Sequence, residues 1–276
     1  MRTPSFLVTN DDGIESPFLD ALVRALLAVG TVTVVAPSGE RSWIAKAISR
    51  RGEVGVRERP GLFPCRAWAI DGTPADCVNL GLGHLVDSPI DAVVSGINIG
   101  SNAGLPLILA SGTVGGALEG ALLGHHAIAS SIRLDPSDFA TITRISEPTI
   151  PTHVRTSLDA AASRTADLAR DVARRKPPRR LLVHNLNFPC GFGPASPLRR
   201  TMPAMMRAGS LFSPVAGSDL RAYAFSFSIG EEQQNARLSD RACIEAGEGS
   251  HSILDFGRIG LSAGTAAVSD EQLHLP

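Results

Sequence analysis

The segment Phe6–Gly13 carries an apolar run that stops at two adjacent carboxylates, Asp11 and Asp12, followed by a glycine. A continuous apolar run is typical of a strand buried on both faces of a parallel sheet, and ligands collect beyond the carboxyl ends of such strands. Two neighbouring carboxylates repel each other, which raises the pKa of one unless a divalent cation neutralises both. The segment therefore fits a hard, oxygen-ligated metal site, or an Asx turn with Asp12 in solvent.

Segments of strand and helix character alternate along the first half of the chain, which is typical of βαβ units and a parallel sheet. Ser16 and Pro17 are suited to begin a helix that Gly30 ends. Further strands are expected at residues 31–36, 91–95, 127–132 and 180–185, and further helices at 73–85, 113–123 and 158–175. The pattern predicts an α/β fold with a doubly wound, mostly parallel sheet.

We expect residues 1–276 to form a single domain with its core at 5–132 and 155–190. The Pro-, Ser- and Thr-rich stretch 134–154 is expected to be a surface excursion, because its prolines interrupt any helix. Residues from about 191 to 276 are expected to form an irregular C-terminal extension. Within it, 223–229 alternates like a strand and 239–245 reads as a helix or turn.

The composition narrows the possible partners. Lys plus Arg number 26 against 27 Asp plus Glu, so the net charge of −1 gives no electrostatic case for a nucleic-acid polymer or an anionic membrane. The four cysteines form no C-x-x-C pair, which suggests neither a zinc knuckle nor a disulfide scaffold. No signal-peptide pattern stands at the N-terminus and no apolar run approaches about 20 residues, so we expect a cytoplasmic protein.

Three further polar segments follow predicted strands, at 36–42, 95–104 and 110–116. The second of these is crowded with Gly, Asn and Ser, residues that let the backbone approach a ligand closely. The third places Ser111, Gly112 and Thr113 at a predicted helix N-terminus, which favours a phosphate. Each segment alone also fits ordinary turn and cap chemistry. There is no G-x-x-x-x-G-K-[ST] or G-x-G-x-x-G pattern, which excludes a P-loop and argues against a dinucleotide site.

Taken together, five blocks resemble the SurE family of survival-protein nucleotidases, which act as metal-dependent phosphatases on nucleoside 5′- and 3′-monophosphates. The blocks are TNDDG at 9–13, VAP at 35–37, DGTPADCV at 71–78, VSGINIGSN at 94–102 and SGTV at 111–114. The resemblance is clear over residues 5–132 and continues weakly through 185–189 to 239–240.

The resemblance implies one divalent metal ion per subunit, Mg²⁺ or Mn²⁺, held by Asp11, Asp12, Ser42 and Asn98. Such an all-oxygen set suits either ion. It also implies that phosphate and substrate are bound by Asn102, Ser111, Gly112 and Thr113. One of the two aspartates is the expected proton acceptor, which makes Asp11 and Asp12 the catalytic candidates. The family also implies a homodimer or homotetramer.

The sequence departs from the family pattern at several positions. Ala45 stands where the family has a second serine, and Ala110 replaces the aromatic residue that precedes Ser-Gly-Thr. Trp43 could replace that aromatic platform or be a packing residue. The departures, which extend to the C-terminal tail, leave two hypotheses: a metal-dependent phosphomonoesterase, or a catalytically weakened nucleotide- or phosphate-binding protein of the same fold.

Overall fold

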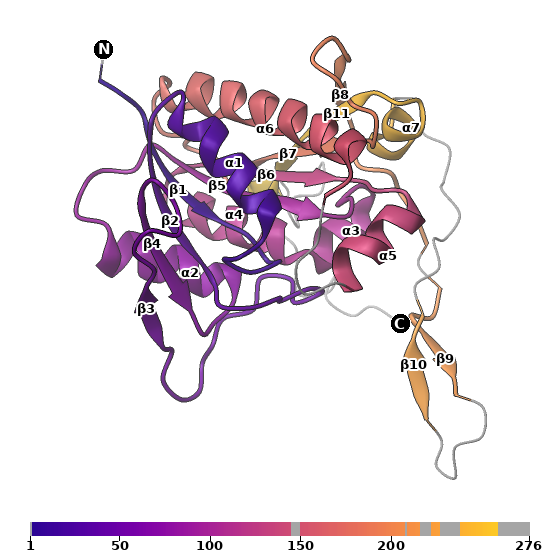
Figure 1. The fold of residues 1–276 in the computed structure, drawn as a ribbon, viewed down its shortest axis with the longest axis horizontal. Coiled ribbons are helices and arrows are strands. Elements are labelled where there is room, and N and C mark those ends of the chain that lie inside the picture. The colour runs from indigo at the N-terminus through magenta and orange to yellow at the C-terminus, as the bar shows by residue number, and fades with distance from the viewer. Residues whose placement is uncertain (1, 145–149, 208, 216–221, 227–237, 259–276) are drawn as a thin grey trace, which may run out of the picture.

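The computed structural model describes all residues except 1, 145–149, 208, 216–221, 227–237 and 259–276. Its centre is a nine-stranded sheet in the order β3-β4-β2-β1-β5-β6-β7-β11-β8 (Figure 1). From β4 to β7 every neighbouring pair is parallel, whereas β3 and β11 run antiparallel to β4 and β7. The expected doubly wound, mostly parallel fold is confirmed.

The strands of this sheet are β1 (Ser5–Thr9), β2 (Thr31–Pro37), β3 (Val56–Glu58), β4 (Arg66–Ile70), β5 (Ala92–Ile99), β6 (His126–Ile132), β7 (Leu182–Phe188), β8 (Leu198–Thr201) and β11 (Gly249–Asp255). The helices are α1 (Pro17–Leu27), α2 (Pro74–Leu80), α3 (Leu105–Ala110), α4 (Gly112–Leu122), α5 (Pro136–Arg144), α6 (Thr152–Ala173) and α7 (Asp240–Glu245). A separate hairpin, β9 (Phe212–Pro214) with β10 (Tyr223–Phe225), projects from the body (Figure 1).

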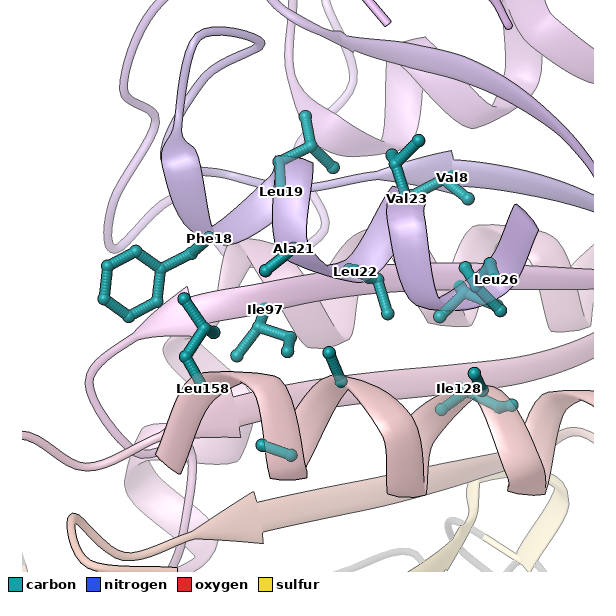
Figure 2. Close-up of a cluster of buried hydrophobic side chains, with 14 of the residues drawn as sticks. Val8, Phe18, Leu19, Ala21, Leu22, Val23, Leu26, Ile97, Ile128 and Leu158 are labelled. Carbon is teal, nitrogen blue, oxygen red and sulfur yellow. The ribbon is translucent and has the colours of Figure 1, made fainter. Parts of the chain in front are cut away.

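Helices cover both faces of the sheet, and the side chains of β1 point alternately to one face and the other. Phe6 and Val8 point to the face covered by α1 and α6, where they join the largest buried cluster (Figure 2). Leu7 points to the opposite face and packs with α2 residues such as Cys77 and Val78. Because both faces are buried, the strand reads as the continuous apolar run seen in the sequence. Among the described residues, no helix combines the length and apolarity needed to cross a membrane.

Two helices begin at the N-cap residues that the sequence predicted. The Ser16 hydroxyl accepts from the backbone N–H of Phe18 at the start of α1, with Pro17 in the first turn. At α2, Thr73 and Asp76 form the predicted reciprocal capping box, with side-chain to backbone distances of 3.1 and 2.8 Å. Both caps follow β-strand ends, so they fix where the chain turns at the carboxyl edge of the sheet.

The stretch 134–154 differs from the expectation, because it contains α5 and the start of α6. Pro136 stands at the beginning of α5 and Pro151 directly before α6. A proline in the first turn loses no helical hydrogen bond, so both residues begin helices that we expected them to interrupt. The expected strand over 223–229 is present at 223–225 and has ended at Ser226, and 227–229 lie outside the described residues.

Candidate active site at the carboxyl edge of the sheet

Asp11 and Asp12 lie just beyond the end of β1, after Asn10, and are held by different elements. Asp11 is buried and accepts hydrogen bonds from the Thr113 hydroxyl, 2.5 Å from its Oδ1, and from the Thr113 backbone N–H, 3.1 Å from its Oδ2. Asp12 is half-buried, and its Oδ2 accepts from the backbone N–H of Ile99 at 3.1 Å. The first turn of α4 and the end of β5 therefore fix the two carboxylates in place.

The protein raises the pKa of both carboxyl groups. Burial raises the pKa of Asp11 from 3.8 to about 6, against the two hydrogen bonds from Thr113 that lower it. Burial also raises the pKa of Asp12, and the charge of Asp11 is the second cause. Glu40 adds a third negative charge that raises the pKa of both. The site thus concentrates negative charge that a bound cation would stabilise.

Glu40 was absent from the sequence-based set of candidates, although it lies in the polar segment 36–42, two residues before Ser42. Its Oε1 accepts a hydrogen bond from the Ser42 hydroxyl at 2.6 Å. The sequence signal for Glu40 was its position two residues before Ser42, a predicted metal ligand. Within the described part of the chain, none of Asp11, Asp12 and Glu40 forms an ion pair with a lysine, arginine or histidine.

The loop after β2, which carries Ser42, is held against the site by backbone hydrogen bonds and by an ion pair with α4. The backbone N–H of Arg41 donates to the Asp11 carbonyl at 2.7 Å, and that of Ala45 donates to the Ala110 carbonyl at 2.9 Å. Lys46 pairs with the buried Glu119 of α4 at 2.6 Å. Ala45 and Ala110, the two departures from the family pattern, are therefore direct neighbours.

Glycines at the start of α4 allow the helix to lie close to Asp11 and to the loop after β2. A Cβ on Gly112 would lie 2.9 Å from both Cβ and Oδ2 of Asp11, and 3.1 Å from the Arg41 carbonyl oxygen. A Cβ on Gly115 would lie 2.3 Å from the Ala45 carbonyl oxygen. These contacts are shorter than ordinary van der Waals separation, so a side chain at either position would push the loops apart.

Asn98 reaches the site through an irregularity in β5. The register between β5 and β6 shifts between Ser95 and Asn98, and such shifts commonly redirect side chains. The Asn98 side-chain amide N–H donates to the Gly100 carbonyl at 2.6 Å, which leaves its Oδ1 as an acceptor for a ligand. Ser42, Asn98 and Asp11 all line one cavity of about 730 Å³.

The predicted phosphate-binding residues fall in two groups. Asn102 and Ser111 line the same cavity; the Asn102 side-chain amide donates to Ser131 at 2.9 Å, and the Ser111 hydroxyl caps α4 by accepting from Val114. Gly112 and Thr113 are buried beneath them, against Asp11. The structure thus brings all eight predicted residues to one edge of the sheet. Thr113 is hydrogen-bonded there to the Asp11 carboxylate.

The outer part of the cavity is aromatic. Trp43 lines it together with Phe139 of α5 and Phe225 of β10, and the Trp43 and Phe225 rings meet edge to face with centroids 5.1 Å apart. Trp43 has a φ of 58°, a conformation that bulky residues rarely adopt and that clusters at turns and functional sites. Arg133 and Arg241 also line the cavity, so its walls offer both flat apolar rings and positive charge.

The donor set fits a hard divalent cation. Asp11, Asp12, Ser42 and Asn98 offer two carboxylates, a hydroxyl and an amide oxygen, and the Asp pair lacks a compensating cation in the described structure. The Asn10 Oδ1 atom is also buried without a hydrogen-bond partner beside them. Oxygen donors with net negative charge are what Mg²⁺ and Mn²⁺ prefer.

The fold and this site define a doubly wound α/β protein that gathers acidic and polar side chains at the carboxyl edge of its parallel strands. The chain belongs to the family described as "Survival protein SurE", whose profile matches residues 6–209.

Curated relatives carry the name 5′-nucleotidase SurE. The one from Geobacter sulfurreducens is 42% identical over 186 residues, covering 67% of this chain and 62% of that protein. The one from Moorella thermoacetica is 41% identical over 186 residues, covering 67% and 64%. The match thus spans less than two thirds of these relatives. The crystal structure of the SurE protein from Aquifex aeolicus superposes with a TM-score of 0.69 and 26% identity, covering 94% of this chain and 95% of that one.

Proposed function

We propose that this protein is a metal-dependent phosphomonoesterase that hydrolyses nucleoside 5′- and 3′-monophosphates to nucleoside and phosphate. The observation that carries the proposal is the adjacent pair Asp11 and Asp12, held by separate elements and uncompensated by any cation of the described chain. Membership of the SurE family and the names of the curated relatives support the same activity.

In this proposal Asp11, Asp12, Ser42 and Asn98 hold one Mg²⁺ or Mn²⁺ ion per subunit. When bound, such an ion polarises a phosphoryl oxygen and lowers the pKa of a coordinated water. The hydrogen bonds from Thr113 and Ile99 hold the carboxylates in a fixed orientation before substrate arrives. One of the two aspartates accepts the proton of the attacking water.

The phosphate is held between Asn102 and the first turn of α4, formed by Ser111, Gly112 and Thr113. The Thr113 backbone N–H donates to Asp11 and that of Val114 to the Ser111 hydroxyl, so the contribution of the α4 start to phosphate binding is chiefly its dipole. Ser111 lines the cavity. The proposal assigns Gly112 the role of letting the helix approach Asp11, because a Cβ there would lie 2.9 Å from the carboxylate.

The nucleoside lies in the aromatic part of the cavity. Trp43, Phe139 and Phe225 provide flat apolar surfaces, and a purine or pyrimidine ring is the flat part of such a substrate. Assembly as a homodimer or homotetramer and a cytoplasmic location stay predictions from the sequence.

The test is phosphate release from a panel of nucleoside 5′- and 3′-monophosphates, first with EDTA and then with Mg²⁺ or Mn²⁺. The proposal expects release only with metal, and higher kcat/KM for nucleotides than for an aliphatic phosphomonoester such as glycerol phosphate. Tight nucleotide binding without any release from folded protein would instead support a weakened binding protein, consistent with Ala45 and Ala110.

A further inference from the structure

A second group of metal-ligating side chains lies outside the carboxylate site. Asp138 from the first turn of α5, His153 from the first turn of α6 and Cys190, two residues after β7, converge with their ligand atoms all within 4.8 Å of one another. The His153 Nε2 atom is 2.7 Å from the Asp138 Oδ2 atom. Two consecutive helices and the segment after β7 therefore bring three different donor types to one point.

This group is distinct from the proposed catalytic site. Asp135, Pro136 and Phe139 line the catalytic cavity, whereas Asp138, His153 and Cys190 are absent from its walls. The start of α5 thus presents one side to the cavity and Asp138 to the second group. None of the eight residues assigned to the catalytic metal or to the phosphate belongs to it.

The two sets of ligands favour different metal ions. A thiolate, an imidazole and a carboxylate are the ligands of Zn²⁺, whereas the all-oxygen set at Asp11 suits Mg²⁺ or Mn²⁺. The half-exposed surroundings leave room for a water as the fourth tetrahedral ligand. Asp135 and Asp138 place negative charge near Cys190, and these charges, after burial as the largest cause, raise the pKa of its thiol.

We propose that Asp138, His153 and Cys190 bind one Zn²⁺ ion. The ion would join α5, α6 and the segment after β7, adding to the Asp138–His153 pair and to the hydrogen bond that the Gly191 backbone N–H donates to the Ser157 hydroxyl at 2.9 Å. Because α5 also carries Phe139 in the cavity wall, zinc at this point would hold that wall against the rest of the fold.

The test is Co²⁺ substitution, because cobalt bound to a thiolate absorbs in the near ultraviolet and cobalt bound only to oxygen does not. The full-length protein is stripped with a chelator and titrated with Co²⁺, in parallel with Cys190→Ser, His153→Ala and Cys65→Ser. Cys65 is a matched control, since it is also a partly buried free cysteine but belongs to no group of metal-ligating side chains among the described residues. Asp12→Asn reports independently on the catalytic site.

We expect the thiolate band in the wild type, in Cys65→Ser and in Asp12→Asn, its loss in Cys190→Ser, and at least tenfold weaker cobalt binding in His153→Ala. Zn²⁺ should abolish the band by displacing cobalt. Absence of the band from folded wild-type protein, or its persistence in Cys190→Ser, would overturn the proposal. Because Asp12→Asn should keep the band, a failure of the nucleotidase proposal would leave this result unaffected.

Discussion

Replacing Asp12 by asparagine should stabilise the chelated protein at alkaline pH. The rise in the pKa of Asp11 from 3.8 to about 6 corresponds to about 3 kcal/mol for ionising one carboxyl of the pair in the fold. Burial and the charge of Asp11 also raise the pKa of Asp12. Asp12→Asn removes the cost of ionising the second buried carboxyl, for which the Asp11 value is the order-of-magnitude guide, about 1–3 kcal/mol of unfolding free energy, while the Ile99 backbone N–H can still donate to an asparagine oxygen.

The size of this stabilisation depends on pH. A carboxyl whose pKa is raised by folding costs nothing below its unfolded pKa of 3.8, and its full cost is present above its folded pKa, about 6 for Asp11. Urea unfolding in EDTA, followed by circular dichroism, should therefore give Asp12→Asn a gain at about pH 8 and almost none at about pH 4. The control is Asp87→Asn, whose side chain is 95% exposed and which should change neither value. Equal destabilisation of Asp12→Asn at both pH values would refute this reasoning.

Three further predictions follow from the site. Mg²⁺ or Mn²⁺ at 100 times its Kd should raise the unfolding free energy of the wild type by about 2.7 kcal/mol and that of Asp12→Asn by far less, as thermal unfolding would show. Gly112→Ala should cost about 1–3 kcal/mol and most of the activity, because its Cβ would lie 2.9 Å from Asp11; unchanged stability and turnover would contradict this. Trp43→Ala should raise KM about 5- to 10-fold for nucleotides, from loss of about 1 kcal/mol of ring contact, and leave KM for glycerol phosphate unchanged.

The parts of the fold that the sequence predicted are those with strong local signals. The apolar run of β1, the Ser16 and Thr73 caps and the Gly-rich loops each specify their structure within a few residues. Since parallel strands bring their carboxyl ends to one edge, the order of strands placed Asp11, Asn98 and Ser111 together.

The parts that the sequence did not predict depend on distant contacts. β4 is a five-residue strand whose place is set by pairing with β2, and β11 joins the sheet antiparallel to β7 across more than 60 residues of sequence. Glu40 acquires its importance from the charges of Asp11 and Asp12, which only the folded chain brings near. The prolines of 134–154 were interpreted as helix breakers because the sequence alone did not show that Pro136 and Pro151 stand at helix starts.

The most direct test of the account compares phosphate release by wild type and Asp12→Asn from one nucleoside 5′-monophosphate, after chelation and then after adding back Mg²⁺ or Mn²⁺. Both proteins are first shown to be folded by circular dichroism. The account predicts that metal restores release by the wild type, and that Asp12→Asn stays at least a hundredfold slower, about 2.7 kcal/mol in activation free energy. Wild-type release that persists in EDTA, or full activity in Asp12→Asn, would contradict it.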